Sequence, residues 1–572
     1  MTFPNRMLPT ATMLACAAAL SACATVSEDA AAPQATGLSI PAVAPGQLSE
    51  AKMKEMTRVL SSDAYEGRAP GTAGEEKTVA YIIESFKNAG LQPGNKGSWV
   101  QDVPLVEITG KSHGPLTIKG NSGAPMEFAF SKDWVGVTYR ENPTTRLQDS
   151  ELVFVGYGIV APEKGWNDYA GIDMRGKTAV ILVNDPDFGA TSEGGLFNGK
   201  AMTYYGRWTY KYEEAARQGA AGAVIVHDTA PASYGWNVVE SSWTGPQAYP
   251  QAGTDAPPTT QVNGWVQKPV AERILAAAGQ NLGDLTARAR QQGFRPIPLG
   301  LTASTSFASD IRKFASKNVI GILPGRGAAD EYVLHTAHWD HLGRCTPAPD
   351  GDDICNGAID NATGTAALAA LGEAHFKAGP ARRSLVFLAV TAEESGLLGA
   401  HYYATNPVYP LNQTVGGINM DAFLVGGPSK DVTVVGPGKS ELDAFLAAAL
   451  ETDGRYVTPD LSSEAGYYYR SDHFAFAKRG VPMLYVDGGE DLVTGGRAAG
   501  EALAAEYRAN RYHGPQDEYD PTWNWAGVMQ DLQLFYRIGR SMAQSTSWPN
   551  WMPGDEFRAI REQDCARAGA GC

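Results

Sequence analysis

Positive charge is scarce in this sequence. Its 572 residues include 47 Lys and Arg against 62 Asp and Glu, which gives a formal net charge of −15. We therefore expect no nucleic acid partner, because binding to phosphate backbones depends on clustered positive charge. Hydrophobic residues make up 43% of the chain, enough for a large core that does not depend on disulfides. The length predicts two or more packed units.

The first apolar stretch, residues 8–20, is too short to span a bilayer. Arg6 is the only charged residue before Glu28, and this pattern predicts a signal peptide that directs the chain out of the cytoplasm. The following segment, up to about Gly46, is rich in Ala, Pro, Ser and Thr and predicts a disordered tether.

Leu20-Ser21-Ala22-Cys23 resembles a bacterial lipobox, in which the cysteine carries a lipid and becomes the new N-terminus. The alternative is ordinary cleavage after a small-residue site. We predict a lipoprotein signal peptide over 1–22, a tether over 23–46 and a lipid anchor at Cys23. The lipid would be the only link to a membrane. Ala24 is not Asp, so the expected location is the periplasmic side of the outer membrane.

Cysteine is also rare, with six in the chain. Two of them fall in the export segment, and the other four form two close pairs, Cys345/Cys355 and Cys565/Cys572. In an oxidising compartment this spacing predicts two short disulfides. Free thiols or a cysteine metal site are the alternatives, and the lack of a Cys-x-x-Cys motif disfavours a metal site.

Hydrophobic spacing divides the rest of the chain. Helical periodicity covers about 48–61 and 73–89, and strand-like runs between Gly-rich turns fill 150–290. Beyond residue 300, strands alternate strictly with helices, which predicts an α/β fold with a mostly parallel sheet flanked by helices. The predicted parts are 47–149 and 300–545 for this domain, 150–290 for a β-rich α+β insertion, and 546–572 for a C-terminal tail.

Acidic and histidine side chains stand where the predicted strands end. His338 and Asp340 follow one strand, Glu393 and Glu394 follow the next, and Asp421 follows a third. Ligands bind beyond the carboxyl ends of strands in open α/β sheets. His and carboxylate without thiolate suit zinc or a similar divalent ion. Taken singly, these patterns are typical of surface pairs and solvated loops, and Asp360 before a helix is typical of an N-cap.

Five motifs in order resemble the M28 family of zinc peptidases, which includes aminopeptidases and glutamate carboxypeptidases. They are Ala337-His338-Trp339-Asp340, Gly357-Ala358-Ile359-Asp360-Asn361, Ala392-Glu393-Glu394-Ser395-Gly396-Leu397, Asn419-Met420-Asp421 and Tyr512-His513. A further similar segment is Ser471-Asp472-His473-Phe474. The resemblance covers roughly 48–145 and 300–545, and it implies the zinc exopeptidase fold.

The resemblance implies a site with two Zn²⁺ ions per chain. Asp360 would bridge the ions, His338 and Asp421 would complete one, and Glu394 and His513 the other. Glu393 would be the general base.

Three further roles rest on position near these motifs. Asp340 is expected to orient His338, because ligating imidazoles usually donate their other N–H to a carboxylate. Tyr512 is a candidate oxyanion donor, with ordinary packing as the alternative. His341 and His473 lie close enough in sequence to support the ligands.

The segment 150–290 resembles a protease-associated (PA) domain, a weaker similarity carried by Gly-flanked apolar strands such as Leu152-Val153-Phe154-Val155-Gly156-Tyr157. We find no catalytic constellation in it.

The sequence thus predicts a metallopeptidase acting on peptide substrates, with an aminopeptidase preferred. A carboxypeptidase or dipeptidase is the alternative, and Arg470 would then bind the substrate carboxylate. A catalytically inactive binding protein is disfavoured, since every expected ligand and the base are present. Oligomeric state is not predicted.

Overall fold

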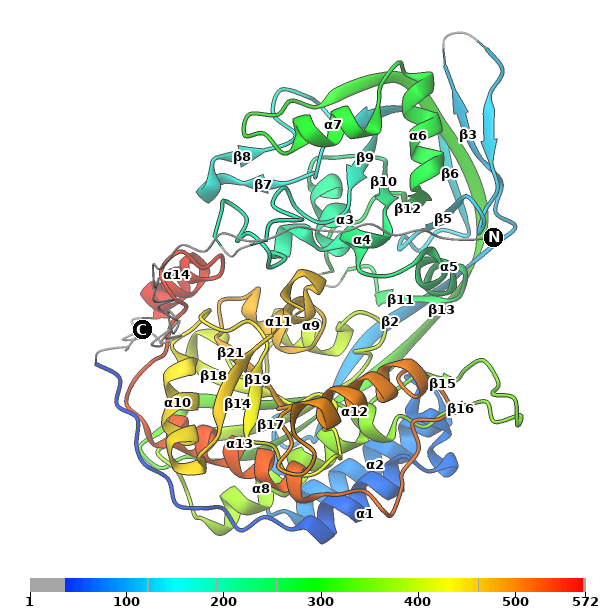
Figure 1. The fold of residues 1–572 in the computed structure, drawn as a ribbon. Coiled ribbons are helices and arrows are strands. Elements are labelled where there is room, and N and C mark those ends of the chain that lie inside the picture. Colours follow the sequence, from blue (N-terminus) through cyan, green and yellow to red (C-terminus); the bar gives the residue numbers. More distant parts are fainter. Residues whose placement is uncertain (1–36, 121–122, 192–193, 254–255, 461, 569–572) are drawn as a thin grey trace, which may run out of the picture. The chain divides into compact units, whose positions relative to one another are not determined.

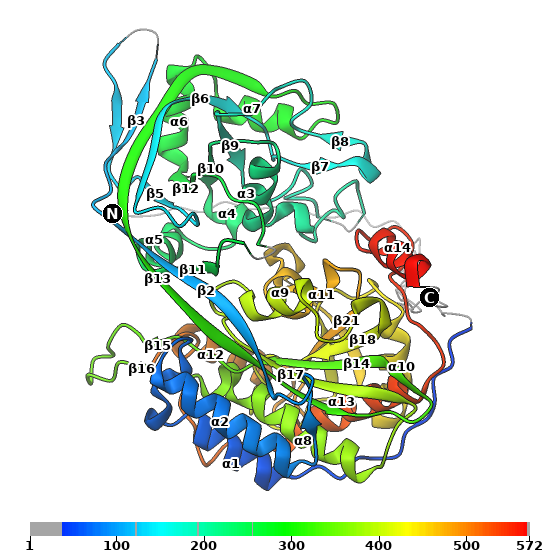
Figure 2. The same cartoon turned by 180° about the vertical axis from the view of Figure 1, so that it is seen from behind.

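The computed structural model describes residues 37–120, 123–191, 194–253, 256–460 and 462–568. Within Gly37–Cys572, which form one unit, two long antiparallel strands, β2 (Val100–Lys111) and β13 (Ile297–Leu323), run side by side. One end of β13 joins a sheet with residues of the C-terminal half, and the other end joins a sheet of the inserted region, residues 112–307 (Figures 1 and 2). We call the remainder, residues 47–99 and 324–568, the main region.

Four neighbouring strands at the centre of the main sheet are parallel. Their order is β17 (Arg383–Val390), β14 (Ala328–His338), β18 (Thr414–Asn419) and β21 (Met483–Gly488). All eight residues of β17 are buried, as expected for a strand covered on both faces. β13 is antiparallel to β17, and β19 (Asp431–Val434) is antiparallel to β21 and pairs with β20 (Tyr456–Pro459). The predicted mostly parallel mixed sheet is confirmed.

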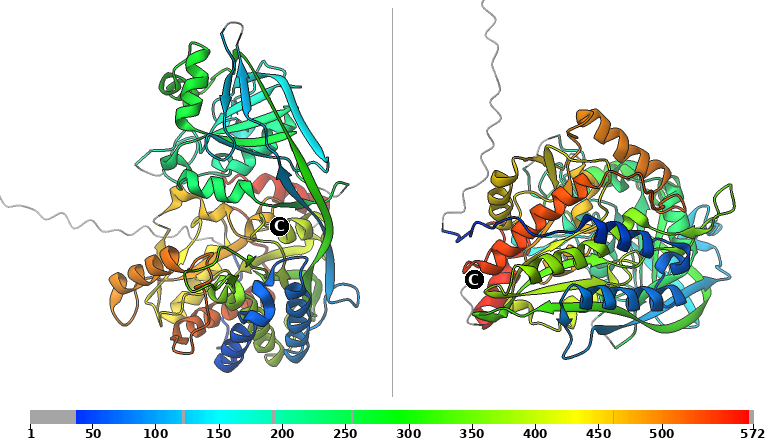
Figure 3. Two further views of the ribbon diagram at one scale, coloured as in Figure 1. Left: turned by 90° about the vertical axis from the view of Figure 1, so that its right-hand side faces the viewer. Right: turned by 90° about the horizontal axis from the view of Figure 1, so that it is seen from below.

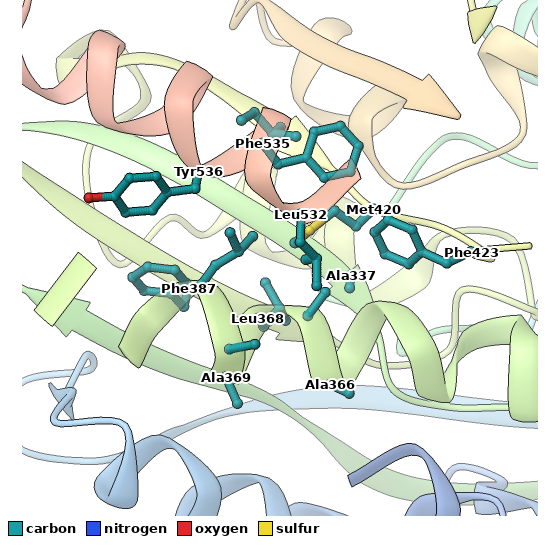
Figure 4. Close-up of a cluster of buried hydrophobic side chains, with 14 of the residues drawn as sticks. Ala337, Ala366, Leu368, Ala369, Phe387, Met420, Phe423, Leu532, Phe535 and Tyr536 are labelled. Atoms are coloured by element: carbon teal, nitrogen blue, oxygen red, sulfur yellow. The ribbon is translucent and has the colours of Figure 1, made fainter. Parts of the chain in front are cut away.

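Helices cover both faces of this sheet, with α1, α2, α8, α10 and α13 packed into one hydrophobic cluster and α9 and α11 into another (Figure 3). The alanine-rich α8 lies close to the sheet because its small side chains allow a short approach. Figure 4 shows its Leu368 beside Phe387 of β17 and Leu532 of α13. The helices of the main region are α1 (Glu50–Leu60), α2 (Ala73–Asn88), α8 (Gly364–Lys377), α9 (Leu398–Thr405), α10 (Leu442–Asp453), α11 (His473–Ala477), α12 (Gly496–Asn510), α13 (Ala526–Gln544) and α14 (Arg558–Ala568).

The inserted region has its own hydrophobic core around a second mixed sheet. Parallel strands β12 (Val262–Gln267), β10 (Gly222–His227), β9 (Thr178–Leu182) and β6 (Thr144–Phe154) are followed by antiparallel β13. Its other elements are β3 (Leu116–Lys119), β4 (Met126–Phe128), β5 (Trp134–Val137), β7 (Val160–Ala161), β8 (Trp166–Asn167), β11 (Gln247–Pro250), α3 (Trp208–Arg217), α4 (Thr229–Ala232), α5 (Trp236–Thr244), α6 (Lys268–Ala277) and α7 (Leu282–Ala289).

This core is larger than the predicted range 150–290. It extends from Leu116 of β3 to Phe307 of β13. The predicted boundary at residue 150 leaves the earlier strands with the main region, because short strands at an antiparallel edge carry little periodicity of their own. In the described residues, no helix has the length and hydropathy needed to cross a membrane. Cys23 and the predicted signal peptide lie outside the described residues.

Candidate metal centre

The predicted site residues meet at the carboxyl ends of the parallel strands. His338 is the last residue of β14, Glu393 and Glu394 follow β17, and Asp421 follows β18. Ala392, the residue before the two glutamates, has a φ of +53°. This left-handed backbone costs energy for a residue other than glycine, and it turns the chain sharply as the strand ends.

One group of ligand atoms consists of His338, Asp360 and Asp421. His338 Nε2 lies 3.2 Å from Asp360 Oδ1 and 3.2 Å from Asp421 Oδ1. The His338 side chain is fully buried, and candidate ligand atoms of all three residues lie within 4.8 Å of one another. Three protein ligands around one point match a catalytic zinc site, which keeps a further position for water or substrate.

A second group surrounds Glu394. His513 Nε2 lies 3.1 Å from Glu394 Oε2 and 3.4 Å from Asp360 Oδ2. His341 Nδ1 lies 2.6 Å from Glu394 Oε1, so this histidine joins the group beside the predicted His513. The two imidazoles differ in exposure: the His341 side chain is buried, whereas that of His513 is 38% exposed.

Asp360 belongs to both groups, with one carboxylate oxygen facing each. Its backbone is not helical, with φ −106° and ψ 95°, and the N-cap of α8 is Thr363. Asp360 is therefore not a helix cap. The preceding Gly357 has a φ of +52°, and a Cβ there would lie 2.1 Å from the Asp360 carbonyl oxygen. Only glycine permits this close turn.

Asp340 supports the site differently from the prediction. His338 Nδ1 lies 3.1 Å from the backbone carbonyl of Asp340 and 3.8 Å from its carboxylate. The carboxylate instead accepts a hydrogen bond from the backbone N–H of Glu393, at 3.1 Å. Asp340 therefore fixes His338 through its main chain and Glu393 through its side chain.

Burial and like charges dominate the electrostatics. Burial raises the pKa of the Glu393 carboxyl well above its usual value; His338 opposes the shift, and the Glu394 charge adds to it. Burial also raises the pKa of Asp340 to about 6. For His513, burial lowers the pKa, but Glu394 and Asp360 more than offset this and hold it well above the usual value. So many carboxylates around few imidazoles favour a bound cation.

The donor set fits zinc. It offers imidazole nitrogens and carboxylate oxygens with no thiolate, and two groups that share one carboxylate are typical of paired metal ions. His338, Asp360 and Asp421 would hold one ion, and Asp360, Glu394 and His513 the other. His341 is placed to hydrogen-bond Oε1 of Glu394, the carboxylate oxygen that does not face His513.

Tyr512 is half exposed, and its ring stacks on the His513 ring with centroids 3.9 Å apart. Arg470 is not among the ligand groups, and its Nη2 donates to the Ala465 carbonyl at 2.6 Å.

The structure contains the predicted Cys345–Cys355 disulfide. Cys565 is also disulfide-bonded, and its predicted partner Cys572 lies outside the described residues.

A family model supports the interpretation of this geometry. The model of peptidase family M28 matches residues 318–536, a range that contains every residue of both ligand groups. Over this range the chain is similar to peptidase family M28.

Several proteins to which the chain is similar are aminopeptidases. The chain is 30% identical to aminopeptidase NAALADL1 of Mus musculus over 138 residues, which are 23% of this chain and 17% of the mouse protein. It thus spans less than a fifth of the length of this relative. A solved aminopeptidase from Aneurinibacillus sp. strain AM-1 is 19% identical, covering 89% of this chain and 95% of that one with a TM-score of 0.47. The zinc aminopeptidase BSAP from Bacillus subtilis is 18% identical, covering 85% and 93% with a TM-score of 0.36.

The site also depends on a residue that belongs to none of the five sequence motifs. Arg68 is fully buried and donates to the carbonyls of Trp339 at 2.9 Å and Gly357 at 2.8 Å. It therefore ties together the two loops that carry His338 and Asp360. No local pattern marks this role, because its partners are 271 and 289 positions away.

Two other supports contact the ligands directly. Asp517 accepts a hydrogen bond from the Asp360 backbone N–H at 3.0 Å, and Ser471 Oγ donates to Asp421 Oδ2 at 2.6 Å. Ser471 lies in the segment Ser471-Asp472-His473-Phe474, whose resemblance to M28 peptidases was the sequence feature that could have indicated this role. Such outer contacts orient ligands and tune metal affinity.

Proposed function

We propose that this protein is a two-zinc aminopeptidase that removes N-terminal residues from peptides. The observation that carries the proposal is the position of the Asp360 carboxylate between the two ligand groups. Its Oδ1 lies 3.2 Å from His338 Nε2 of one group, and its Oδ2 lies 3.4 Å from His513 Nε2 of the other. A shared carboxylate of this kind supports a co-catalytic pair of ions.

When bound, zinc would polarise the scissile carbonyl and lower the pKa of the attacking water. Glu393 would accept a proton from that water and pass it to the leaving amine. Burial raises the pKa of Glu393 above the usual value of a carboxyl, which makes its carboxylate a stronger base. Asp340 would fix the backbone of this glutamate, and Tyr512 is proposed to donate a hydrogen bond to the developing oxyanion.

The charge of the site supports attack at the N-terminal end of the substrate. An aminopeptidase must hold a free ammonium group near the reacting carbonyl, and the surplus of carboxylates around His338 favours a cation there. A carboxypeptidase or dipeptidase is the alternative within the family, and an inactive binding protein would lack turnover altogether.

Amino-acid anilides with and without an acetylated amine test this proposal. The zinc-loaded protein should hydrolyse the free-amine form and leave the acetylated form intact. A chelator should abolish the reaction, and added Zn²⁺ should restore it. Cleavage of blocked peptides with a free carboxylate would favour the carboxypeptidase instead, and failure to cleave either class would contradict a peptidase.

Export and lipid anchoring are part of the proposal. Cys23 in the lipobox-like segment supports an outer-membrane lipoprotein facing the periplasm. Cys23→Ser should release the protein from membranes or leave it unprocessed; unchanged membrane association with normal maturation would contradict the anchor. We also propose that the inserted region is a PA-like domain, on the Gly-flanked strands described above.

A further inference from the structure

The two glutamates of the site lie on a short loop between a strand and a helix. The loop begins at Thr391, directly after β17, and ends at Gly399 in the first turn of α9. Its ends are joined by backbone hydrogen bonds. The N–H of Gly399 donates to the Thr391 carbonyl at 2.9 Å, and the N–H of Leu398 donates to the Ala392 carbonyl at 3.0 Å. We call residues 391–399 the glutamate loop.

The backbone of the glutamate loop is strained on either side of the glutamates. Ala392 has a φ of +53° and Leu397 a φ of +63°, both in the left-handed region that favours glycine. Residues keep such a conformation only where the surrounding structure restrains them. The tip of the loop offers little restraint, because Ser395 and Gly396 are exposed. The restraint is therefore expected at the buried ends of the loop.

One buried side chain hydrogen-bonds both ends of the glutamate loop. Asn318 of β13 is fully buried. Its Oδ1 accepts from the backbone N–H of Thr391 at 3.1 Å, and its Nδ2 donates to the carbonyl of Gly399 at 2.9 Å. A Cβ on Gly399 would lie 2.6 Å from Asn318 Oδ1, so the two segments are in close contact. The amide thus bridges the first and last residues of the loop.

The bridge lies where the strand ladder stops. The ladder between β13 and β17 ends at the pair Val319 and Ala389, and β13 continues from there along β2 toward the inserted region. The buried N–H of Thr391 lies past this last pair. A buried backbone N–H without an acceptor is costly. The Asn318 side chain therefore supplies the acceptor that a neighbouring strand supplies elsewhere in the sheet.

Other contacts fix Asn318 and the start of the loop. Asn318 Nδ2 also donates to Gln101 Oε1 of β2 at 3.1 Å. From the same strand as Asn318, Ser316 Oγ lies 2.5 Å from Thr391 Oγ1. Both serine and threonine are fully buried. Thr391 is therefore fixed to β13 through its backbone and through its side chain.

We propose that Asn318 is a positioning residue for the aminopeptidase reaction. By bridging the ends of the glutamate loop, it sets the position of the Glu393 carboxylate as base and of the Glu394 carboxylate as ligand. It acts through the backbone of the loop rather than on the substrate. A shift of about 1 Å in a catalytic group can lower a rate about 100-fold. The kinetic part of this inference rests on the proposed function, whereas the metal-binding part does not need turnover.

A double-mutant cycle with the base tests the proposal. We would measure kcat at saturating Zn²⁺ with a free-amine anilide for wild type, Asn318→Ala, Glu393→Gln and the double variant. Asn318→Ala should lower kcat about 10–100-fold in the wild-type background, the usual effect of losing an outer support. In the Glu393→Gln background it should have little further effect, because the group that it positions is already absent. A general loss of stability would instead lower kcat equally in both backgrounds.

Zinc affinity is the second readout. Asn318→Ala should weaken zinc binding about 10–100-fold in competition with a metal indicator, since it loosens the loop that carries Glu394. Asn263→Ala is the matched control. Asn263 of β12 is also fully buried, and its Oδ1 accepts from Thr260 Oγ1 at 2.6 Å within the inserted region. This variant should lower the melting temperature but keep the kcat and zinc affinity of the wild type.

A milder variant covers the case in which Asn318→Ala does not fold. Ser316→Ala removes one hydroxyl group at the same end of the loop. It should show the same loss of kcat, the same non-additivity with Glu393→Gln and the same weaker zinc binding, each at a smaller size. Wild-type kcat and zinc affinity in this variant would then overturn the proposal.

The outcomes separate the positioning role from the proposed function. Equal losses of kcat in both backgrounds, or wild-type kcat and zinc affinity in folded Asn318→Ala, would overturn the positioning role and leave the peptidase intact. If wild-type protein hydrolyses no free-amine substrate, the proposed function fails. The zinc titration then decides the inference: weaker binding in Asn318→Ala supports it, and unchanged binding contradicts it.

Discussion

Buried ionisable groups occur both in the inserted region and at the metal centre, but their charges are balanced in different ways. In the inserted region, Lys211 Nζ donates to the Tyr157 carbonyl at 2.6 Å, and the carboxylates of Asp168 and Asp185 lie near enough to affect its pKa. At the metal centre, Asp472 is buried, and neither oxygen of its carboxylate accepts a hydrogen bond from the described residues. The carboxylates of Asp421, Asp340 and Glu394 are near enough to affect its pKa.

The difference separates a structural network from a binding site. Asp168 accepts from Trp166 Nε1 at 2.8 Å, and Asp185 accepts from the Thr203 hydroxyl at 2.9 Å. Opposite charges and internal donors therefore complete the inserted network. At the metal centre like charges accumulate, and burial raises the pKa of Asp472 well above its usual value. A buried group of like charges must be compensated by protonation or by a cation, and the imidazole and carboxylate ligands of this centre suit a cation.

The largest expected effect is on turnover at the metal centre. Glu393→Gln should reduce kcat about 10²–10⁴-fold because it removes the general base but keeps its size. Metal content should stay near that of the wild type, as measured by elemental analysis. Glu394→Gln is the matched variant, and it should lose bound metal because it removes a ligand. If the two metal contents are reversed, the roles of the two glutamates are reversed as well.

The next effect tests the inserted network. Lys211→Met should reduce the free energy of unfolding by about 3–5 kcal/mol, because it leaves Asp185 and Asp168 buried without a cation. Denaturant unfolding followed by fluorescence would measure this. Lys268→Met removes a 47% exposed lysine paired with Asp228 and should cost less than about 1 kcal/mol. Equal effects of the two variants would mean that the buried network does not depend on charge balance.

A smaller effect is expected at the loop between the two ligands His338 and Asp360. The disulfide joins Cys345 and Cys355, ten positions apart, and closing a loop of this size stabilises a fold by about 2–3 kcal/mol. Cys345→Ala with Cys355→Ala should lower stability by that amount in denaturant titrations. Metal affinity should fall too, since Cys355 Sγ contacts the His513 carbonyl at 3.7 Å. Unchanged stability and metal affinity would show that the loop is held by other contacts.

The smallest expected effect concerns ligand orientation. Ser471→Ala removes the hydroxyl that donates to Asp421, and it should weaken zinc binding about 10–100-fold. Competition with a metal indicator would measure the affinity. Ser462→Ala, at an exposed position, serves as the control. A normal affinity in Ser471→Ala would mean that Asp421 is positioned by its strand alone.

The sequence by itself determined the layered α/β fold and the ligand types. The unbroken apolar run of β17 and the 3.6-residue pattern of α1 and α2 are local signals, and they predicted these elements within a few residues. The order of the His, Asp and Glu motifs predicted which side chains gather at the strand ends, since parallel strands deliver their carboxyl ends to one edge.

Only the tertiary structure decided which side chains support those ligands. Arg68 donates to the Trp339 carbonyl across 271 positions of sequence, and His341 Nδ1 lies 2.6 Å from Glu394 Oε1. Such contacts depend on the packing of segments far apart in the chain and on the direction of each side chain. Neither is encoded in local periodicity, because a turn residue or a helix-flanking arginine has the same sequence pattern whether it faces solvent or a buried charge.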